Sequence, residues 1–141
     1  MKQELVRDWM TREVITISPE TTLAEAHKLM VEKRVRRLPV LDQDRIVGIV
    51  TLGDVRGAEP SRATSLSVWE MNDLLAKLKV TEIMTSQPRV IQQDASIGEA
   101  ARIMLDNKFS GLPVVDEAGR LSGIITESDI FRLVTSEWSR D

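Results

Sequence analysis

Apolar positions along this chain follow a helical spacing in two separate stretches. In residues 23–34 and again in residues 97–108, apolar side chains recur every three or four positions, which predicts two amphipathic helices. Thr22 and Ser96 stand directly before these stretches, and each is followed three positions later by a glutamate. This spacing is typical of a capping box, so it predicts where each helix begins.

Short apolar runs predict the strands that accompany these helices. Residues 14–17 and 89–91 precede the helices as strand candidates. After the helices, the runs LPVLD and LPVVD each lead through a tight turn into a second apolar run, IVGIVT or LSGIIT. A last helix is expected to begin at the threonine of GIVTLGD in one copy and of GIITESD in the other. Each copy therefore reads β-α-β-β-α.

The two copies are an internal repeat. When residues 10–54 are aligned with residues 84–129, 15 of the 45 positions are identical, with one residue inserted at the turn of the second copy. A unit of about fifty residues buries too little surface to be stable alone. We therefore predict an α/β (α+β) fold in which two repeats pack sheet to sheet with pseudo-twofold symmetry.

The repeat divides the chain into three parts. Residues 1–58 are predicted to form the first repeat with an N-terminal helix, residues 59–79 a connecting segment and helix, and residues 80–141 the second repeat. The connecting segment begins with a polar run, and Ser67 is the expected N-cap of its helix. The apolar stripe of that helix is expected at five positions: Val68, Met71, Leu74, Leu75 and Leu78.

Composition narrows the classes of function. The 141 residues carry a net charge of −3, which gives no overall reason to expect nucleic acid or an anionic membrane as partner. There are no cysteines and only one histidine, His27, so thiol chemistry and metal sites with two imidazoles are excluded. The N-terminus lacks the apolar core of a signal peptide, and no run is long enough to cross a bilayer. We expect a cytoplasmic protein.

The motifs of both copies resemble the cystathionine-β-synthase (CBS) domain. MTREVITISPETTLAEA, RRLPVLD and GIVTLGD match one domain, and MTSQPRVIQQDASIGEA, SGLPVVD and GIITESD match a second. Two such domains in a row resemble the CBS pair called a Bateman module. The resemblance implies a regulatory protein that binds AMP, ADP, ATP or S-adenosylmethionine in clefts between paired domains, and that commonly forms a homodimer.

The Thr-x-x-Asp pairs of the last two motifs allow two interpretations. Thr51 with Asp54, and Thr126 with Asp129, have capping-box spacing, and helix capping alone would explain them at about 1 kcal/mol each. The resemblance instead implies that the aspartates accept hydrogen bonds from the two ribose hydroxyls and that the threonines face the phosphates. A helix N-terminus also suits an anion.

The residues before LPV distinguish the two candidate sites. Ser110 and Gly111 are small and would leave room for an adenine edge beside the backbone, whereas Arg36 and Arg37 are bulky. The resemblance implies that Arg37 reaches across to phosphates bound by the second repeat. The preferred site therefore consists of Ser110, Gly111, Thr126, Asp129 and Arg37.

Five other positions complete the predicted ligand-binding set. Gln87 and Arg89 are expected to frame the base through main-chain atoms, and Thr51 with Asp54 would form a weaker first site beside Arg36. No metal ligand and no catalytic residue is predicted.

The sequence leaves two functions open and argues against a third. The first is a stand-alone regulatory protein that signals the level of an adenosine-containing ligand to an unknown effector protein. The second is a ligand-free dimeric scaffold that kept the fold, with Trp69 and Trp138 as candidate dimer contacts. An enzyme is not expected, because the chain has no glycine-rich phosphate loop and no nucleophile with an adjacent base.

Overall fold

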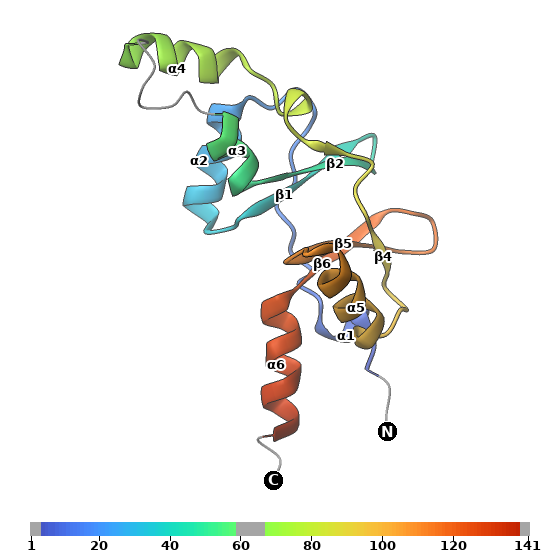
Figure 1. The fold of residues 1–141 in the computed structure, drawn as a ribbon. Coiled ribbons are helices and arrows are strands. Elements are labelled where there is room, and N and C mark those ends of the chain that lie inside the picture. Colours follow the sequence, from blue (N-terminus) through green and yellow to red (C-terminus); the bar gives the residue numbers. More distant parts are fainter. Residues whose placement is uncertain (1–3, 59–66, 139–141) are drawn as a thin grey trace. The chain divides into compact units, whose positions relative to one another are not determined.

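The computed structural model describes residues 4–58 and 67–138, and it divides the chain into two compact units (Figure 1). One unit comprises residues 15–88, and the other comprises residues 1–14 together with residues 89–141. Each unit contains a three-stranded sheet and helices, which confirms the predicted mixed α and β class. The packing of one repeat against the other stays a prediction. The polar part of the connecting segment, residues 59–66, lies outside the described residues.

The unit of residues 15–88 carries the first repeat and the connecting helix. Its antiparallel sheet has the order β1-β2-β3, and Figure 1 shows α2 and α3 beside the β1–β2 hairpin. Its elements along the chain are α2 (Leu23–Lys33), β1 (Arg37–Asp42), β2 (Arg45–Thr51), α3 (Leu52–Ala58), α4 (Val68–Lys77), the 3-10 turn η1 (Val80–Glu82) and β3 (Thr85–Ser86).

The other unit carries the second repeat and the N-terminal segment. Its sheet has the order β4-β5-β6, in which β4 runs parallel to β5 and β6 runs antiparallel to it. Its elements are α1 (Val6–Trp9), β4 (Ile91–Gln92), α5 (Ile97–Asn107), β5 (Gly111–Val115), β6 (Leu121–Thr126) and α6 (Glu127–Trp138).

Each core includes residues from the segment that precedes the other repeat. Val6 and Met10, which the sequence analysis assigned to the first repeat, are buried in the core of the second with Leu112. Val80 is buried in the core of the first repeat with Leu38. The segment that begins each repeat in the sequence therefore packs into the unit that contains the other repeat.

The predicted helix starts are confirmed. The hydroxyls of Thr22, Ser67 and Ser96 each accept a hydrogen bond from the backbone N–H three residues later, at 3.2, 3.1 and 3.1 Å. These caps satisfy backbone donors that have no partner inside the helix. At the other ends of α2 and α5, Arg34 and Lys108 adopt the left-handed conformation that closes a helix.

The first strand candidate of each repeat is shorter than predicted, because proline limits the ladder. Residues 14–17 form no strand, and only Ile17 makes a parallel bridge with Val40. In this bridge the N–H of Ile17 donates to the carbonyl of Pro39, and the N–H of Leu41 donates to the carbonyl of Ile17. Extending this ladder toward the N-terminus would need an N–H from Pro39, which has none. Pro113 occupies the same place beside β4, which begins only at Ile91.

The connecting helix α4 buries less than its apolar stripe predicted. Leu75 and Leu78 pack against the core of their unit. Val68 is 70% exposed, and no residue of α4 is fully buried. The stripe therefore covers the unit only at its C-terminal end.

Candidate functional site

Each unit has one corner at which a strand passes directly into a helix. β2 ends at Thr51 and α3 begins with the next residue, and β6 ends at Thr126 directly before α6. At both corners the aspartate three residues after the threonine turns back to the start of the helix. We call these the first-repeat corner and the second-repeat corner.

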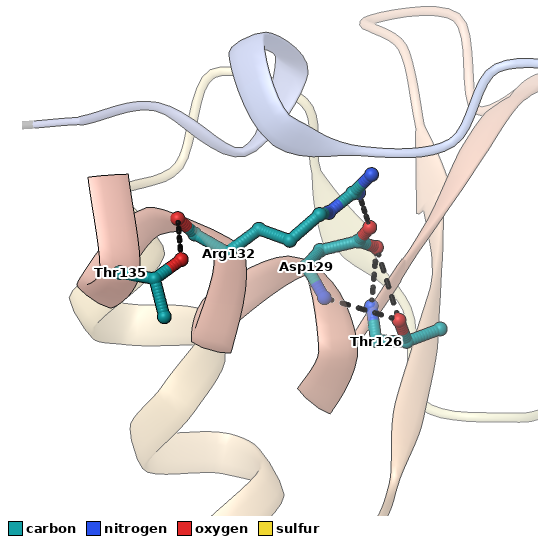
Figure 2. A network of polar contacts seen from close by, with 4 residues as sticks. All are labelled: Thr126, Asp129, Arg132 and Thr135. Atoms are coloured by element: carbon teal, nitrogen blue, oxygen red, sulfur yellow. Dashed lines mark hydrogen bonds and ion pairs between the residues drawn. The ribbon is translucent and has the colours of Figure 1, made fainter. Parts of the chain in front are cut away.

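At the second-repeat corner, Asp129 is held by the residues around it. Its side chain is 3% exposed, and it is the one fully buried charged residue among those that the structure describes. Its Oδ2 accepts hydrogen bonds from the backbone N–H and the hydroxyl of Thr126, at 2.8 and 3.1 Å (Figure 2). Its Oδ1 forms an ion pair with the guanidinium of Arg132. Both carboxylate oxygens thus have a partner.

The first-repeat corner repeats the cap without the ion pair. Oδ2 of Asp54 accepts from the backbone N–H of Thr51 at 2.9 Å, and Oγ1 of Thr51 accepts from the backbone N–H of Asp54 at 3.1 Å. Asp54 is partly exposed, and Gly57 stands where the second repeat has Arg132. The capping interpretation of both Thr-x-x-Asp pairs is confirmed, whereas their contact with a ribose stays a prediction.

The structure brings the small residues before the second LPV to the second-repeat corner. Gly111 lies opposite Thr126 in the β5–β6 ladder. The carbonyl of Ser110 accepts the backbone N–H of Glu127, the first residue of α6, at 3.1 Å. Ser110, Gly111, Thr126 and Asp129 therefore lie together at this corner, and their binding of a ligand stays a prediction.

The first-repeat corner has the same construction with arginines in place of small residues. Arg37 lies opposite Thr51 in the β1–β2 ladder, and the carbonyl of Arg36 accepts the backbone N–H of Leu52 at 2.8 Å. Arg37 thus neighbours Thr51, and Arg36 neighbours the first residue of α3. Arg37 belongs to the unit of residues 15–88, so its predicted reach to a ligand on the second repeat stays a prediction.

Gln87 and Arg89 lie where the chain passes from one unit to the other. Gln87 follows β3, has a left-handed φ of 50°, and donates its backbone N–H to the carbonyl of Val47 at 3.2 Å. Arg89 is exposed and belongs to the same unit as the second-repeat corner. Their predicted role beside the base stays a prediction.

The sequence analysis missed Arg132. The sequence signal was present, because a basic residue three positions after an acidic residue lies on the same face of a helix. It was overlooked because the matching position of the first repeat is a glycine, so the alignment of the repeats did not mark it.

Metal-binding clusters and membrane-spanning helices are both absent from the described residues. No three histidine, cysteine, aspartate or glutamate side chains within 4–58 and 67–138 gather in a way that would hold a metal ion. Across the same ranges, no helix has the length and apolar character needed to cross a membrane.

Known proteins share the motifs and the fold. The family model of the CBS domain matches residues 6–61 and 80–136, which confirms the predicted resemblance. A CBS domain-containing protein of Dictyostelium discoideum is 36% identical over 131 residues, which cover 92% of this chain and 90% of that protein. Other relatives are longer: the chain spans 62% of the chloroplastic protein CBSX1 of Arabidopsis thaliana and 23% of an inosine-5'-monophosphate dehydrogenase of Korarchaeum cryptofilum.

Two solved structures with the same fold contain adenosine compounds. The crystal structure of CBSX2 in complex with AMP has a TM-score of 0.79 and 33% sequence identity, and the match covers 94% of this chain and 97% of that one. The CBS domain pair of protein MJ0100, in complex with 5'-methylthioadenosine and S-adenosyl-L-methionine, also has a TM-score of 0.79, with 28% identity and coverage of 96% and 99%.

Proposed function

The chain belongs to the CBS domain family, and from this premise we propose that it is a regulatory protein that binds AMP, ADP or ATP. The second-repeat corner is the proposed site, with Asp129 on the ribose and Thr126 on the phosphate side. Ligand binding would then change the affinity of the protein for an effector protein, which requires that the ligand bind two conformational states unequally. S-adenosylmethionine is the alternative ligand, because it shares the ribose and the adenine.

The observation that carries this proposal is that four of the predicted ligand-binding residues lie close together at one corner of a CBS fold. Ser110 and Gly111 place main-chain groups and little side-chain bulk beside Thr126. Asp129 supplies an acceptor at the start of a twelve-residue helix, whose N-terminus favours negative charge. The two similar structures that contain AMP or S-adenosyl-L-methionine support an adenosine-containing ligand.

A neutral variant of Asp129 tests the proposed ribose contact. The amide oxygen of asparagine is an acceptor that can take the place of Oδ2, so Asp129→Asn should keep the hydrogen bond from the backbone of Thr126 and preserve the fold. It removes the charge and one acceptor, and we expect AMP affinity to fall about tenfold or more. Isothermal titration with AMP, ATP and S-adenosylmethionine measures the affinities, and thermal unfolding checks the fold.

Ser96→Ala is the matched control for that experiment. Ser96 caps α5 in the same unit, so the variant loses a cap of about 1 kcal/mol at a position with no proposed role in ligand binding. It should lower the melting temperature and leave AMP affinity unchanged. Equal AMP affinities for the wild type and Asp129→Asn would disprove the ribose contact.

A ligand-free scaffold is the second candidate function, and the contacts of Asp129 favour it. Both carboxylate oxygens are engaged by protein groups, and the side chain is almost fully buried. A protein that kept the corner only for capping would show this arrangement. Such a protein would unfold at the same temperature with and without millimolar AMP, whereas a binding protein would be stabilised by the ligand.

For either candidate we propose a homodimer, to which α6 contributes. Phe131, Val134 and Trp138 are 64%, 44% and 78% exposed and lie three or four residues apart, which places them on one side of the helix. We expect Trp138→Ala to weaken dimerisation about tenfold or more, because a buried tryptophan is often a dominant contact of an interface. Sedimentation equilibrium would measure this, with the exposed Arg102→Ala as control. An unchanged dimer would exclude Trp138 from the contact.

A further inference from the structure

Arg132 has no role in the nucleotide proposal, although its position affects the proposed site directly. Figure 2 shows its side chain extended along α6 to the carboxylate of Asp129. The hydroxyl of Thr135 donates to the backbone carbonyl of Arg132 at 3.0 Å, and the guanidinium of Arg132 contacts the corner through Asp129. The arginine side chain is 62% exposed, whereas that of the aspartate is 3% exposed.

The two oxygens of Asp129 differ in what holds them. Oδ2 is held by the backbone and hydroxyl of Thr126, which are part of the strand-to-helix corner and cannot leave it without opening the helix start. Oδ1 is held by Arg132, a long side chain that extends into solvent. Displacing the guanidinium therefore requires only a change of side-chain rotamer, and Oδ1 is the oxygen that a ligand could reach.

A ribose hydroxyl that binds Oδ1 must compete with this guanidinium. For adenosine, the exchange replaces an ion pair with a hydrogen bond from an uncharged hydroxyl, and the displaced guanidinium gains no anionic partner in return. A phosphorylated ligand differs, because its phosphate gives the released guanidinium a new anionic partner. Arginine is suited to this exchange, since its planar fork binds carboxylate and phosphate in the same bidentate way.

We propose that Arg132 is a selectivity residue that makes the second-repeat corner prefer AMP to adenosine, by exchanging the carboxylate of Asp129 for the phosphate of the ligand. This inference rests on the proposed nucleotide-binding function. The first-repeat corner has Gly57 at the matching position, so it has no arginine there that could make this exchange. The two corners therefore differ in which ligands they accept, as well as in the residues before LPV.

Titrating adenosine and AMP separately into the wild type and Arg132→Ala tests the proposal. The variant should bind adenosine about three- to fivefold more tightly, because the competing ion pair is gone, and it should bind AMP no more tightly than the wild type. The ratio of AMP affinity to adenosine affinity should thus fall at least about threefold. Arg102→Ala removes the same charge from an exposed position on α5 in the same unit, and it should leave the ratio unchanged.

Arg132→Gln is a second variant that keeps most of the side-chain length and the helical propensity. It should lower the ratio as Arg132→Ala does, and it serves if the alanine variant does not fold. An unchanged ratio in the folded variants would overturn the proposal, and so would an equal gain in affinity for both ligands. If the folded wild type and its variants bind neither ligand, the proposed nucleotide function itself is wrong, and this inference is overturned with it.

Discussion

Replacing Gly123 by alanine is expected to lower the free energy of unfolding by about 2 kcal/mol. A Cβ at this position would lie 2.7 Å from the backbone carbonyl oxygen of Thr11 and 2.7 Å from the sulfur of Met10. Thr11 is fixed there, because its N–H and carbonyl both pair with Ile124 on β6. The clash would therefore push the N-terminal segment off the sheet. Chemical unfolding, monitored by circular dichroism, measures the change.

Two other glycines serve as controls for Gly123→Ala. At Gly48, the matching position of the first repeat, the atoms nearest to a Cβ all belong to the side chain of Met84, which is flexible and can move aside at lower cost. A Cβ at Gly57 would meet nothing within 4 Å, and alanine in a helix is favoured over glycine by about 1 kcal/mol. Stability should thus decrease most for Gly123→Ala, less for Gly48→Ala, and increase for Gly57→Ala. Equal stability of the first two variants would contradict the role assigned to Thr11.

A fragment of residues 15–88 is expected to unfold cooperatively on heating, whereas a fragment of residues 1–79, cut at the boundary of the sequence repeat, is not. The core of the first repeat lies entirely within residues 15–88. The second fragment lacks Val80, which is fully buried, and also Met84 and β3. Burial of one valine is worth about 1.5 kcal/mol or more, which is a large part of the stability of so small a unit.

Far-UV circular dichroism during heating distinguishes the two fragments. Their similar lengths make the comparison direct, because chain length alone predicts no difference between them. A fragment of residues 1–79 that melts as cooperatively as residues 15–88 would show that the exchanged segment contributes little to the first unit.

The repeat begins earlier in the chain than the alignment suggested. Val6 and Val80 are identical, lie at the same offset as the rest of the first part of the alignment, and are both fully buried. The residues between Val6 and Met10 differ from those between Val80 and Met84, so sequence comparison alone did not extend the repeat to them. Their equivalence becomes clear only from the core that each valine enters.

At the candidate site, the local sequence predicted the helix caps and did not predict the burial of the aspartates. The Thr-x-x-Asp spacing predicted two caps, and both are present. The same spacing could not predict that Asp129 is buried whereas Asp54 is partly exposed. Burial depends on what the rest of the unit packs around each corner, and the two corners have the same local motif.

The amino-acid sequence by itself determined the order of the elements, the starts of the capped helices and the two strand-to-helix corners. These features depend on periodicity and on hydrogen bonds between residues three or four positions apart, which any short segment of the chain already contains. Only the tertiary structure decided that the start of each repeat packs into the unit of the other, and that none of the stripe on α4 is fully buried. Those outcomes depend on contacts between residues far apart in the chain, which are chosen by how well whole surfaces pack and not by any local pattern.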